Sequence, residues 1–500
     1  MAAVLLLALL VPAATAGAAA LGRWPVVTRF AGVIASAGAL GCGLALIAWT
    51  AGAATGGHRS VQPVAVVALA GLLRADALSA FMLTVIGAVG LTATWAGLSA
   101  DDAPRERSYS TLIALFLSAM SLAVLADNLG VLWVAVEFTT IATAFLVGHH
   151  RTRGSIEAAW KYVMLGSVGI AIAFLGIVLL YAATRANGSP TLSWLELSAG
   201  PAGLDVDLVR AATALAVLGF ATKAGLAPMH SWLPDAHSQA PAPVSGLMSG
   251  VLLAVAFYAI LRIRVIADAV IGPGFMRGLL TVGALASLAV AALLILRQRD
   301  YKRMLAYSSI EHMGLLALGA AVGGPLATAA VLLHVLGHGL TKAVVFVLSG
   351  RILAVTGSTR IDAVRGLLQT RPRIAVPFLA GMAALLGFPP FSLFFSEVGI
   401  LLAAWRAGMS LVTGAVLVLL LVVFVGLVQA VVAMTLGPAP DATETAATEA
   451  AAAEDVSSHG SGVGPRAPIA IALGVCVLAG IAFDPTDGAI ARAVAALVGG

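Results

Sequence analysis

The stretch ALAVLGFATKAGLAPMHSWLPDAHSQAPAP, residues 214–243, decides the fold of this chain. Its first half is apolar enough to lie in a lipid bilayer, yet it carries Lys223, followed closely by Gly225 and Pro228. Proline removes a backbone donor and clashes with the preceding turn, so it breaks or kinks a helix. At membrane depth, a broken helix is tolerated only where protein or a water-filled cavity surrounds it. The stretch therefore predicts an interrupted helix inside a bundle, with a charge at the break.

A second interruption of the same kind occurs later in the chain. Residues 380–405 read AGMAALLGFPPFSLFFSEVGILLAAW, in which Gly387, Pro389 and Pro390 precede Glu397. Two broken helices in corresponding positions of two halves indicate an inverted repeat with ion sites at the breaks. Two ordinary proline kinks are the alternative explanation of the pattern.

The composition is that of a membrane protein. Of 500 residues, 60% are hydrophobic and 10% charged, and mean hydropathy is +1.03; a soluble domain has about 25% charged residues. A hydrocarbon core about 30 Å thick requires roughly 20 apolar residues per helix. The apolar runs lack the alternation of a β-barrel. We therefore predict an all-α polytopic bundle with about fourteen spans: 2–20, 31–50, 76–98, 109–126, 129–148, 159–182, 208–227, 243–266, 275–296, 304–323, 325–350, 375–404, 410–435 and 467–483.

We expect the chain to be organised in five segments, with one broken helix in each of the two repeats. The expected segments are three N-terminal helices (1–108), a first five-helix repeat (109–266), a second repeat (267–436), a disordered cytoplasmic linker (437–466) and the last transmembrane helix (467–500). The linker assignment follows from its Ala-, Glu-, Thr- and Ser-rich composition. The N-terminus resembles a signal peptide but lacks a basic start, so we expect an uncleaved first span.

The net charge is +5, and the distribution of the basic residues is explained by membrane topology rather than by nucleic-acid binding. If the spans alternate in direction, seventeen Lys and Arg residues fall in loops on one side and nine on the other. The positive-inside rule then puts the first set in the cytoplasm and both termini on the outer face of the cell inner (cytoplasmic) membrane. Cys42 and Cys476 lie far apart within spans and are interpreted as core residues. No spacing predicts a metal, haem or iron–sulfur site.

Glu137 and Lys223 each lie inside a membrane-length apolar stretch. A charge at the bilayer centre costs about 3 kcal/mol even on the lenient insertion scale. A carboxylate in VLWVAVEFTTIATAFLVG (131–148) must pair with a cation or hold a proton, and Lys223 is the natural partner. A neighbouring charge can change the protonation state of such a pair, which is what a proton pump requires. A static ion pair that joins two helices is the alternative.

A row of three titratable side chains occurs in LLHVLGHGLTKAVVFVLSG (332–350). His334, His338 and Lys342 stand at i, i+4 and i+8, which places them on one helix face. Histidine titrates near neutral pH and suits proton relay. The H-x3-H spacing also permits a metal, but no Glu or Cys stands nearby in the sequence. With Glu397, the row supplies acid and base stations across the middle of the bundle.

Other polar side chains fall near the expected span ends. His230 and His237 follow the first break, and Glu311 and His312 lie in RMLAYSSIEHMGLLALG (303–319). We interpret these four as possible sites of proton uptake or release. Snorkelling or helix capping is the alternative role.

Four strings resemble the antiporter-like membrane proteins of respiratory complex I and Mrp-type cation/proton antiporters. They are residues 219–250, 296–314, 332–350 and 387–401. Within that superfamily, the chain looks most like the F component of group four membrane-bound [NiFe] hydrogenases, of the hydrogenase-four and formate hydrogenlyase type. The segment SIEAAWKYVMLGSVGIAIAFLGIVLLY (155–181) favours that branch. The resemblance covers roughly residues 70 to 435.

The resemblance implies a fourteen-helix fold with two inverted five-helix repeats and a proton path in the membrane plane. By motif, Glu137 matches the glutamate of the fifth helix and Lys223 the lysine of the broken seventh. His334, His338 and Lys342 match the connecting groups of the eleventh helix, and Glu397 the charged residue of the twelfth. One departure is Ala254, where many members carry a lysine; water, His230 or another polar group must bridge that gap.

The expected function is proton translocation as a membrane subunit of a multi-subunit redox complex. The resemblance implies partner antiporter-like subunits and a peripheral hydrogenase or dehydrogenase arm that holds the Ni-Fe and iron–sulfur centres, with no cofactor and no catalytic residue in this chain. A Mrp-type Na+/H+ antiporter subunit is the main alternative. A complex I variant, a non-pumping structural subunit and a relative linked to bicarbonate or carbon dioxide also remain open.

Overall fold

The computed structural model describes residues 1–55, 65–98, 107–438, 464–484 and 488–498. Most of the expected linker, 437–466, lies outside these residues. In the described part, eleven helices are long and apolar enough to cross a membrane. Together with two interrupted helices and the shorter α20, they occupy all fourteen expected spans, so the prediction of a polytopic helical bundle is confirmed.

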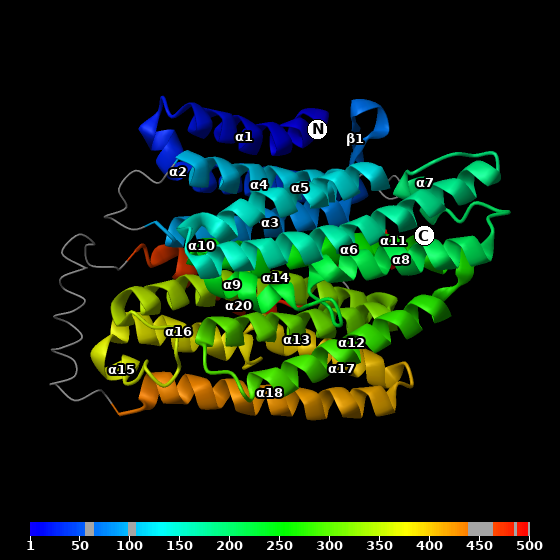
Figure 1. Ribbon diagram of the computed structural model, residues 1–500. Helices are drawn as coiled ribbons and strands as arrows, with labels where there is room; N and C mark the ends of the chain where they lie inside the picture. Colours follow the sequence, from blue (N-terminus) through cyan, green and yellow to red (C-terminus); the bar gives the residue numbers. More distant parts are fainter. Residues whose placement is uncertain (56–64, 99–106, 439–463, 485–487, 499–500) are drawn as a thin grey trace.

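The helices lie roughly side by side along one direction (Figure 1). The uninterrupted spans are α1 (Ala2–Leu21), α2 (Pro25–Thr55), α3 (Ala77–Ala96), α4 (Arg107–Leu125), α5 (Leu129–Val147), α6 (Arg153–Ala186), α12 (Pro273–Ile295), α13 (Tyr301–Val322), α14 (Gly324–Thr356), α18 (Ser410–Leu436) and α20 (Ala467–Ile481). A further span consists of α10 (Ala242–Leu247), a π-helical turn (Met248–Leu252) and α11 (Leu253–Ile271).

Short elements join the spans. Strands β1 (Val66–Ala68) and β2 (Leu73–Ala75) form an antiparallel hairpin before α3. The remaining short helices are α7 (Trp194–Ser198), α15 (Leu367–Thr370) and α21 (Gly488–Val498). The segment 467–500, expected as one transmembrane helix, therefore contains two helices, α20 and α21.

Side chains of the helix starts satisfy backbone donors that have no partner within the helix. The Asp76 carboxylate accepts from Ser79 N at the start of α3, and the Asp300 carboxylate accepts from Arg303 N at the start of α13. The hydroxyl of Thr152 accepts from Ser155 N in the same way before α6. Such caps each contribute about 1 kcal/mol and fix where a span begins.

Both predicted interruptions are present. The first separates α8 (Val206–Ala224) from α9 (Trp232–Gln239), and the second separates α16 (Pro372–Leu385) from α17 (Ser392–Arg406). Gly225 and Gly387 follow the ends of α8 and α16. Their φ angles are 74° and 67°, a left-handed conformation that residues with a Cβ rarely adopt.

Neighbouring side chains satisfy the backbone groups that the first break releases. The Trp232 indole donates to Thr222 O at 2.8 Å, and Ala227 N donates to Ser287 Oγ at 2.9 Å. Since no water is available in hydrocarbon, these bonds are what allow non-helical backbone at this depth.

The three helices that carry most titratable groups are also the most buried. In α11, α13 and α14 nearly every residue is covered by other helices, whereas α1, α2, α6 and α18 expose apolar side chains. Glycines bring α14 close to its neighbours: a Cβ at Gly339 would lie 2.8 Å from Gly250 O, and one at Gly337 would overlap Ser392 Oγ. The centre of the bundle is therefore tightly packed protein, and polar groups there can meet only each other.

Candidate proton path

Lys223 lies in the last turn of α8, directly before the first break, and its side chain is fully buried. Its ammonium donates to Tyr162 Oη of α6 at 2.8 Å. The same phenolic oxygen is 2.6 Å from Thr143 Oγ1 of α5, and the Tyr162 ring packs on Trp232 with centroids 4.9 Å apart. The lysine is thus held by a hydroxyl network that joins α5, α6 and α8.

Glu137 does not form the expected ion pair with Lys223. Its carboxylate is partly exposed on α5 and accepts from Ser167 Oγ at 2.9 Å and from Thr140 Oγ1 at 3.1 Å. Among the described ion pairs, none joins the carboxylate to Lys223. A Cβ at Gly166 would lie 3.3 Å from Lys223 Nζ and 3.5 Å from Thr140 Cγ2, so Thr140 stands beside the lysine. Hydroxyl groups, rather than direct contact, connect the two charges.

The predicted row on α14 is present and fully internal. His334, His338 and Lys342 lie along one stretch of continuous helix and expose at most 1% of their surface. The Lys342 ammonium donates to Leu305 O at 2.8 Å and to Ser308 Oγ at 2.5 Å, both on α13. The rings of His334 and His338 stack at 6.2 Å with an interplanar angle of 13°. The spacing argument therefore places these three groups correctly.

His312 completes this row from the neighbouring helix α13. Its ring centroid is 5.1 Å from that of His334 and 4.9 Å from that of His338, and its Nδ1 is 3.1 Å from His334 Nε2. Glu311 Oε2 lies 3.5 Å from His312 Nε2. Both residues were expected near a span end, but they lie in the middle of α13 and are almost completely buried, because α13 is surrounded by α12, α14, α9 and α17.

Glu397 joins the same cluster from α17. One ligand atom each from His312, His334 and Glu397 lie within 4.8 Å of one another. The carboxylate rests against the second break, where a Cβ at Gly387 would lie 2.6 Å from Oε2. The expectation that no carboxylate lies near the histidines is therefore wrong. Glu397 is distant in the sequence, but the broken helix brings it into contact with α13 and α14.

The direction of the hydrogen bonds in this cluster follows from Ser396. Its hydroxyl donates to Leu393 O at 2.9 Å, so its oxygen accepts from His334 Nδ1–H, which lies 2.9 Å away. Neutral His334 then has a free lone pair on Nε2, which accepts from His312 Nδ1–H. His312 Nε2 makes no hydrogen bond within the described residues and lies 3.5 Å from Glu311 Oε2. The result is an ordered pair of hydrogen bonds from His312 through His334 to Ser396, with Glu311 beside its open end.

His237 occupies the region between Lys223 and the row on α14. It is fully buried in α9, and its ring lies 6.1 Å from Trp232 and 5.6 Å from Phe346. Its Nδ1 is bonded to Leu233 O at 2.9 Å, and Nε2 has no partner among the described side chains. Ala254, at the position where a lysine was expected from the resemblance, is buried and apolar. His237 is therefore better placed than the half-exposed His230 to bridge that gap.

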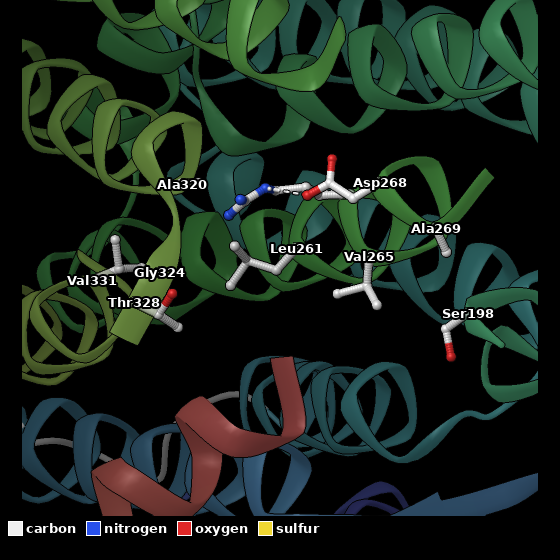
Figure 2. A pocket seen from close by; sticks show the side chains of 10 residues that line it. Ser198, Leu261, Val265, Asp268, Ala269, Ala320, Gly324, Thr328 and Val331 are labelled. Carbon is white, nitrogen blue, oxygen red and sulfur yellow. Dashed lines mark ion pairs between the residues drawn. The ribbon is translucent and has the colours of Figure 1, made fainter. Parts of the chain in front are cut away.

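A cavity of about 290 Å³ lies between α11 and the first turns of α14 (Figure 2). On α11 it is lined by the ion pair of Arg264 and Asp268, 3.2 Å apart, and on α14 by Gly324, Thr328 and Val331. These α14 positions recur every three to four residues, and the same spacing continues to His338 and Lys342. The cavity thus lies at the Gly324 end of α14, on the same helix face as the row, without reaching the titratable side chains.

Sequence reasoning missed several polar side chains that hold the charged groups. They are hydroxyl groups in apolar spans: Thr140, Thr143, Tyr162, Ser167, Ser308 and Ser396. A single hydroxyl in a membrane helix is common and gives little signal. The small residues around Tyr162 and Ser167, in YVMLGSVG, were the available hint of a closely packed polar face.

We expect Gly387→Ala to displace Glu397 and impair proton transfer. The new methyl group would overlap the carboxylate, and alanine at this left-handed φ costs about 1–2 kcal/mol. The variant should show a lower melting temperature and at least a severalfold loss of proton translocation in vesicles. Gly414→Ala on α18 is the control, since nothing lies within 4 Å of its added methyl; an equal loss in both variants would contradict the prediction.

These features define a class of protein: a polytopic membrane subunit in which two broken helices flank a buried row of lysine, histidine and glutamate. The family described as NADH:quinone oxidoreductase/Mrp antiporter, transmembrane, matches residues 126–424. Because this match spans more than half of the sequence, the chain belongs to the NADH:quinone oxidoreductase/Mrp antiporter membrane family.

Individual relatives agree with this assignment. The chain is 40% identical over 307 residues to the Hydrogenase-4 component F homolog of Methylacidiphilum infernorum (60% of this chain, 64% of the relative) and 33% identical over 338 residues to NADH-quinone oxidoreductase subunit N of Desulforudis audaxviator (67% and 66%). The matched regions thus span just under two thirds of these curated relatives. The expected resemblance to the hydrogenase-four type is confirmed.

A solved structure shares the fold. A chain of the Mrp complex from Dietzia sp. DQ12-45-1b superposes with a TM-score of 0.83, covering 99% of this chain and 97% of that chain at 24% identity. This likeness concerns the fold alone.

Proposed function

We propose that this chain is a proton-translocating membrane subunit of a multi-subunit redox complex of the hydrogenase-four or complex I type. The observation that carries the proposal is the continuous buried series of titratable groups through the centre of the bundle. A soluble-type core would exclude such groups, and a simple membrane anchor gains nothing from them. The family of the chain and its likeness to the hydrogenase-4 component support the same interpretation.

The proposed path starts at Glu137, on the partly exposed face of α5, where a neighbouring subunit can act on its charge. A charge change there alters the proton affinity of Lys223 through the hydroxyl groups of Thr140 and Tyr162. Lys223 then releases or takes up a proton. His237 then connects Lys223 to Lys342. From Lys342 the path continues over a series of residues in α13, α14 and α17: His338, His312, His334 and Glu397, with Glu311 beside them.

The order along α14 therefore begins at Lys342, which is opposite to the numbering of the row. Each step needs hydrogen-bond contact, either direct or through water. His312 and His334 are in direct hydrogen-bond contact. The 290 Å³ cavity at the Gly324 end of α14 is large enough for several waters, which supports access of water to that end of the helix. His230 remains a candidate for proton uptake.

The side chains of the central row favour protons over sodium. Sodium, like other hard cations, is held by several oxygen ligands. The centre of the row instead presents imidazole nitrogens that already exchange a hydrogen bond with each other. The partners we propose are further antiporter-like membrane subunits and a peripheral arm in which the Ni-Fe and iron–sulfur centres reside.

We also propose the two inverted five-helix repeats, 109–266 and 267–436, as the structural basis of two half-paths, each with one broken helix. The positive-inside distribution supports insertion in the cytoplasmic membrane with both termini outside. Arg262 is one of the nine basic residues counted on the outer side; it lies within α11 and is buried, so it does not contribute to that distribution.

Mild-detergent purification from native membranes tests the parent complex. We expect nickel and iron to co-purify with the chain, and hydrogen- or formate-dependent proton uptake in inverted vesicles. Iron without nickel would instead indicate a complex I variant. If neither metal co-purifies and sodium drives proton exchange without an electron donor, the redox-complex proposal is wrong and the antiporter alternative holds.

A further inference from the structure

The cluster of His312, His334 and Glu397 has a geometry that a proton path does not require. One ligand atom from each side chain lies within 4.8 Å of the others, although the residues come from three helices, α13, α14 and α17. We propose that this cluster binds a single zinc ion. The composition, two imidazoles and one carboxylate with a fourth position left to water, is one that zinc commonly accepts.

The spacing of the two imidazole nitrogens suits a shared ion. His312 Nδ1 and His334 Nε2 are 3.1 Å apart. Zinc–nitrogen bonds of 2.0–2.1 Å at a tetrahedral angle separate two nitrogens by about 3.4 Å. The ion therefore needs the nitrogens to part by only a few tenths of an ångström, and it replaces the proton that they share.

Each imidazole has an oxygen behind its outer nitrogen: a hydroxyl that is hydrogen-bonded to His334, and a carboxylate 3.5 Å from His312 Nε2, which makes no hydrogen bond within the described part of the chain. His334 Nδ1–H donates to Ser396 Oγ at 2.9 Å, which leaves the Nε2 lone pair free to bind the ion. Zinc binding at His312 Nδ1 requires the other neutral tautomer of the ring, in which the proton has moved from Nδ1 to Nε2, the atom that lies 3.5 Å from Glu311 Oε2. A carboxylate or hydroxyl behind each imidazole fixes the ring orientation and strengthens the metal bond.

The charges of the site also balance. The carboxylates of Glu397 and Glu311 together offset the two positive charges of the ion, so the complex is neutral in a buried, low-dielectric setting. Magnesium and calcium require six or more oxygen ligands, which these nitrogens cannot supply. The cluster therefore selects a transition-metal ion over the abundant alkaline-earth ions.

Zinc at this position would stop proton movement along the row. The ion would occupy the Nδ1 and Nε2 atoms through which His312 and His334 exchange a proton, and would hold Glu397 in place. This inhibitory consequence depends on the proposed function, whereas the binding itself does not. Binding and transport are therefore measured separately.

The binding test uses the purified, chelator-washed complex carrying His149→Gln and His150→Gln, which removes a second pair of adjacent histidines. Equilibrium dialysis against buffered free zinc, with the metal quantified by mass spectrometry, should give one ion per chain. His334→Gln and Glu397→Gln should each weaken binding at least tenfold, and Glu311→Gln by about 10–100-fold. Zinc X-ray absorption should show two imidazoles and oxygen ligands.

His338→Gln is the matched control, because His338 lies 4.9 Å from the His312 ring but outside the ligand set, and it should bind zinc like the parent. Absence of stoichiometric zinc, or equal weakening in His338→Gln and His334→Gln, would overturn the proposed site. Micromolar zinc should also halve proton uptake near its dissociation constant. Zinc bound in the expected way, in a complex that moves no protons, would refute the proposed function and leave the site standing.

Discussion

Replacing Lys223 with methionine is expected to abolish coupled proton translocation while the complex still assembles. The lysine is fully buried and donates to Tyr162 Oη, and methionine in its place can neither hold nor release a proton at that position. Removal of a positioned acid–base group costs about 100-fold or more in proton-transfer rate. Proton uptake per electron transferred, measured in inverted vesicles, should fall to the background level.

The fold of this variant should survive for a physical reason. Methionine has nearly the length of lysine and no charge, so it fills the same space without the cost of burying an ammonium that has no direct ion-pair partner. Lys161→Met is the control: this lysine is exposed at the start of α6 and pairs with Glu157 and Asp235. A normal proton yield in Lys223→Met, with the complex intact, would exclude Lys223 from the path.

The second large effect is expected at Asp76, which forms a buried ion pair with Arg262. The carboxylate at the start of α3 lies 2.7 Å from the guanidinium of α11, and the two side chains are 2% and 1% exposed. The guanidinium also donates to Tyr258 Oη at 3.0 Å and stacks 3.8 Å from the Trp194 ring. The pair ties the N-terminal helices to the central ones.

Asp76→Ala should therefore destabilise the protein by about 3–5 kcal/mol, because it leaves Arg262 as an uncompensated buried charge. Unfolding in mixed micelles of increasing SDS content measures the change. The double variant Asp76→Leu with Arg262→Met should recover most of the loss, since it removes both charges and keeps the volume. If Asp76→Ala unfolds like the parent, the pair does not hold the bundle together.

The positions of the spans could be read from the sequence because the bilayer sets their length. Roughly 20 apolar residues must be helical to satisfy their own backbone in hydrocarbon, so every expected span is found where it was placed. The breaks after Lys223 and before Glu397 were equally readable, since proline and glycine act locally on the backbone. The same holds for the row of His334, His338 and Lys342, whose alignment depends only on the helical repeat.

Contacts between helices were decided by the tertiary structure. The pairing of Glu137 with Lys223 failed because hydroxyl groups of Thr140 and Tyr162 stand between α5 and α8, and no sequence rule predicts which side chains intervene. Arg262 falls inside the expected span 243–266, but only the packing of α3 against α11 shows that Asp76 neutralises it.

The central cluster shows the same division. Glu311, His312 and Glu397 are far from His334 in sequence, and only the packing of α13 and α17 against α14, with the return of the chain at Gly387, brings them together. Sequence by itself determined which groups enter the membrane, because hydrophobicity and helix periodicity are local properties. The tertiary structure decided which of them exchange protons, because hydrogen-bond distance depends on how separate helices pack.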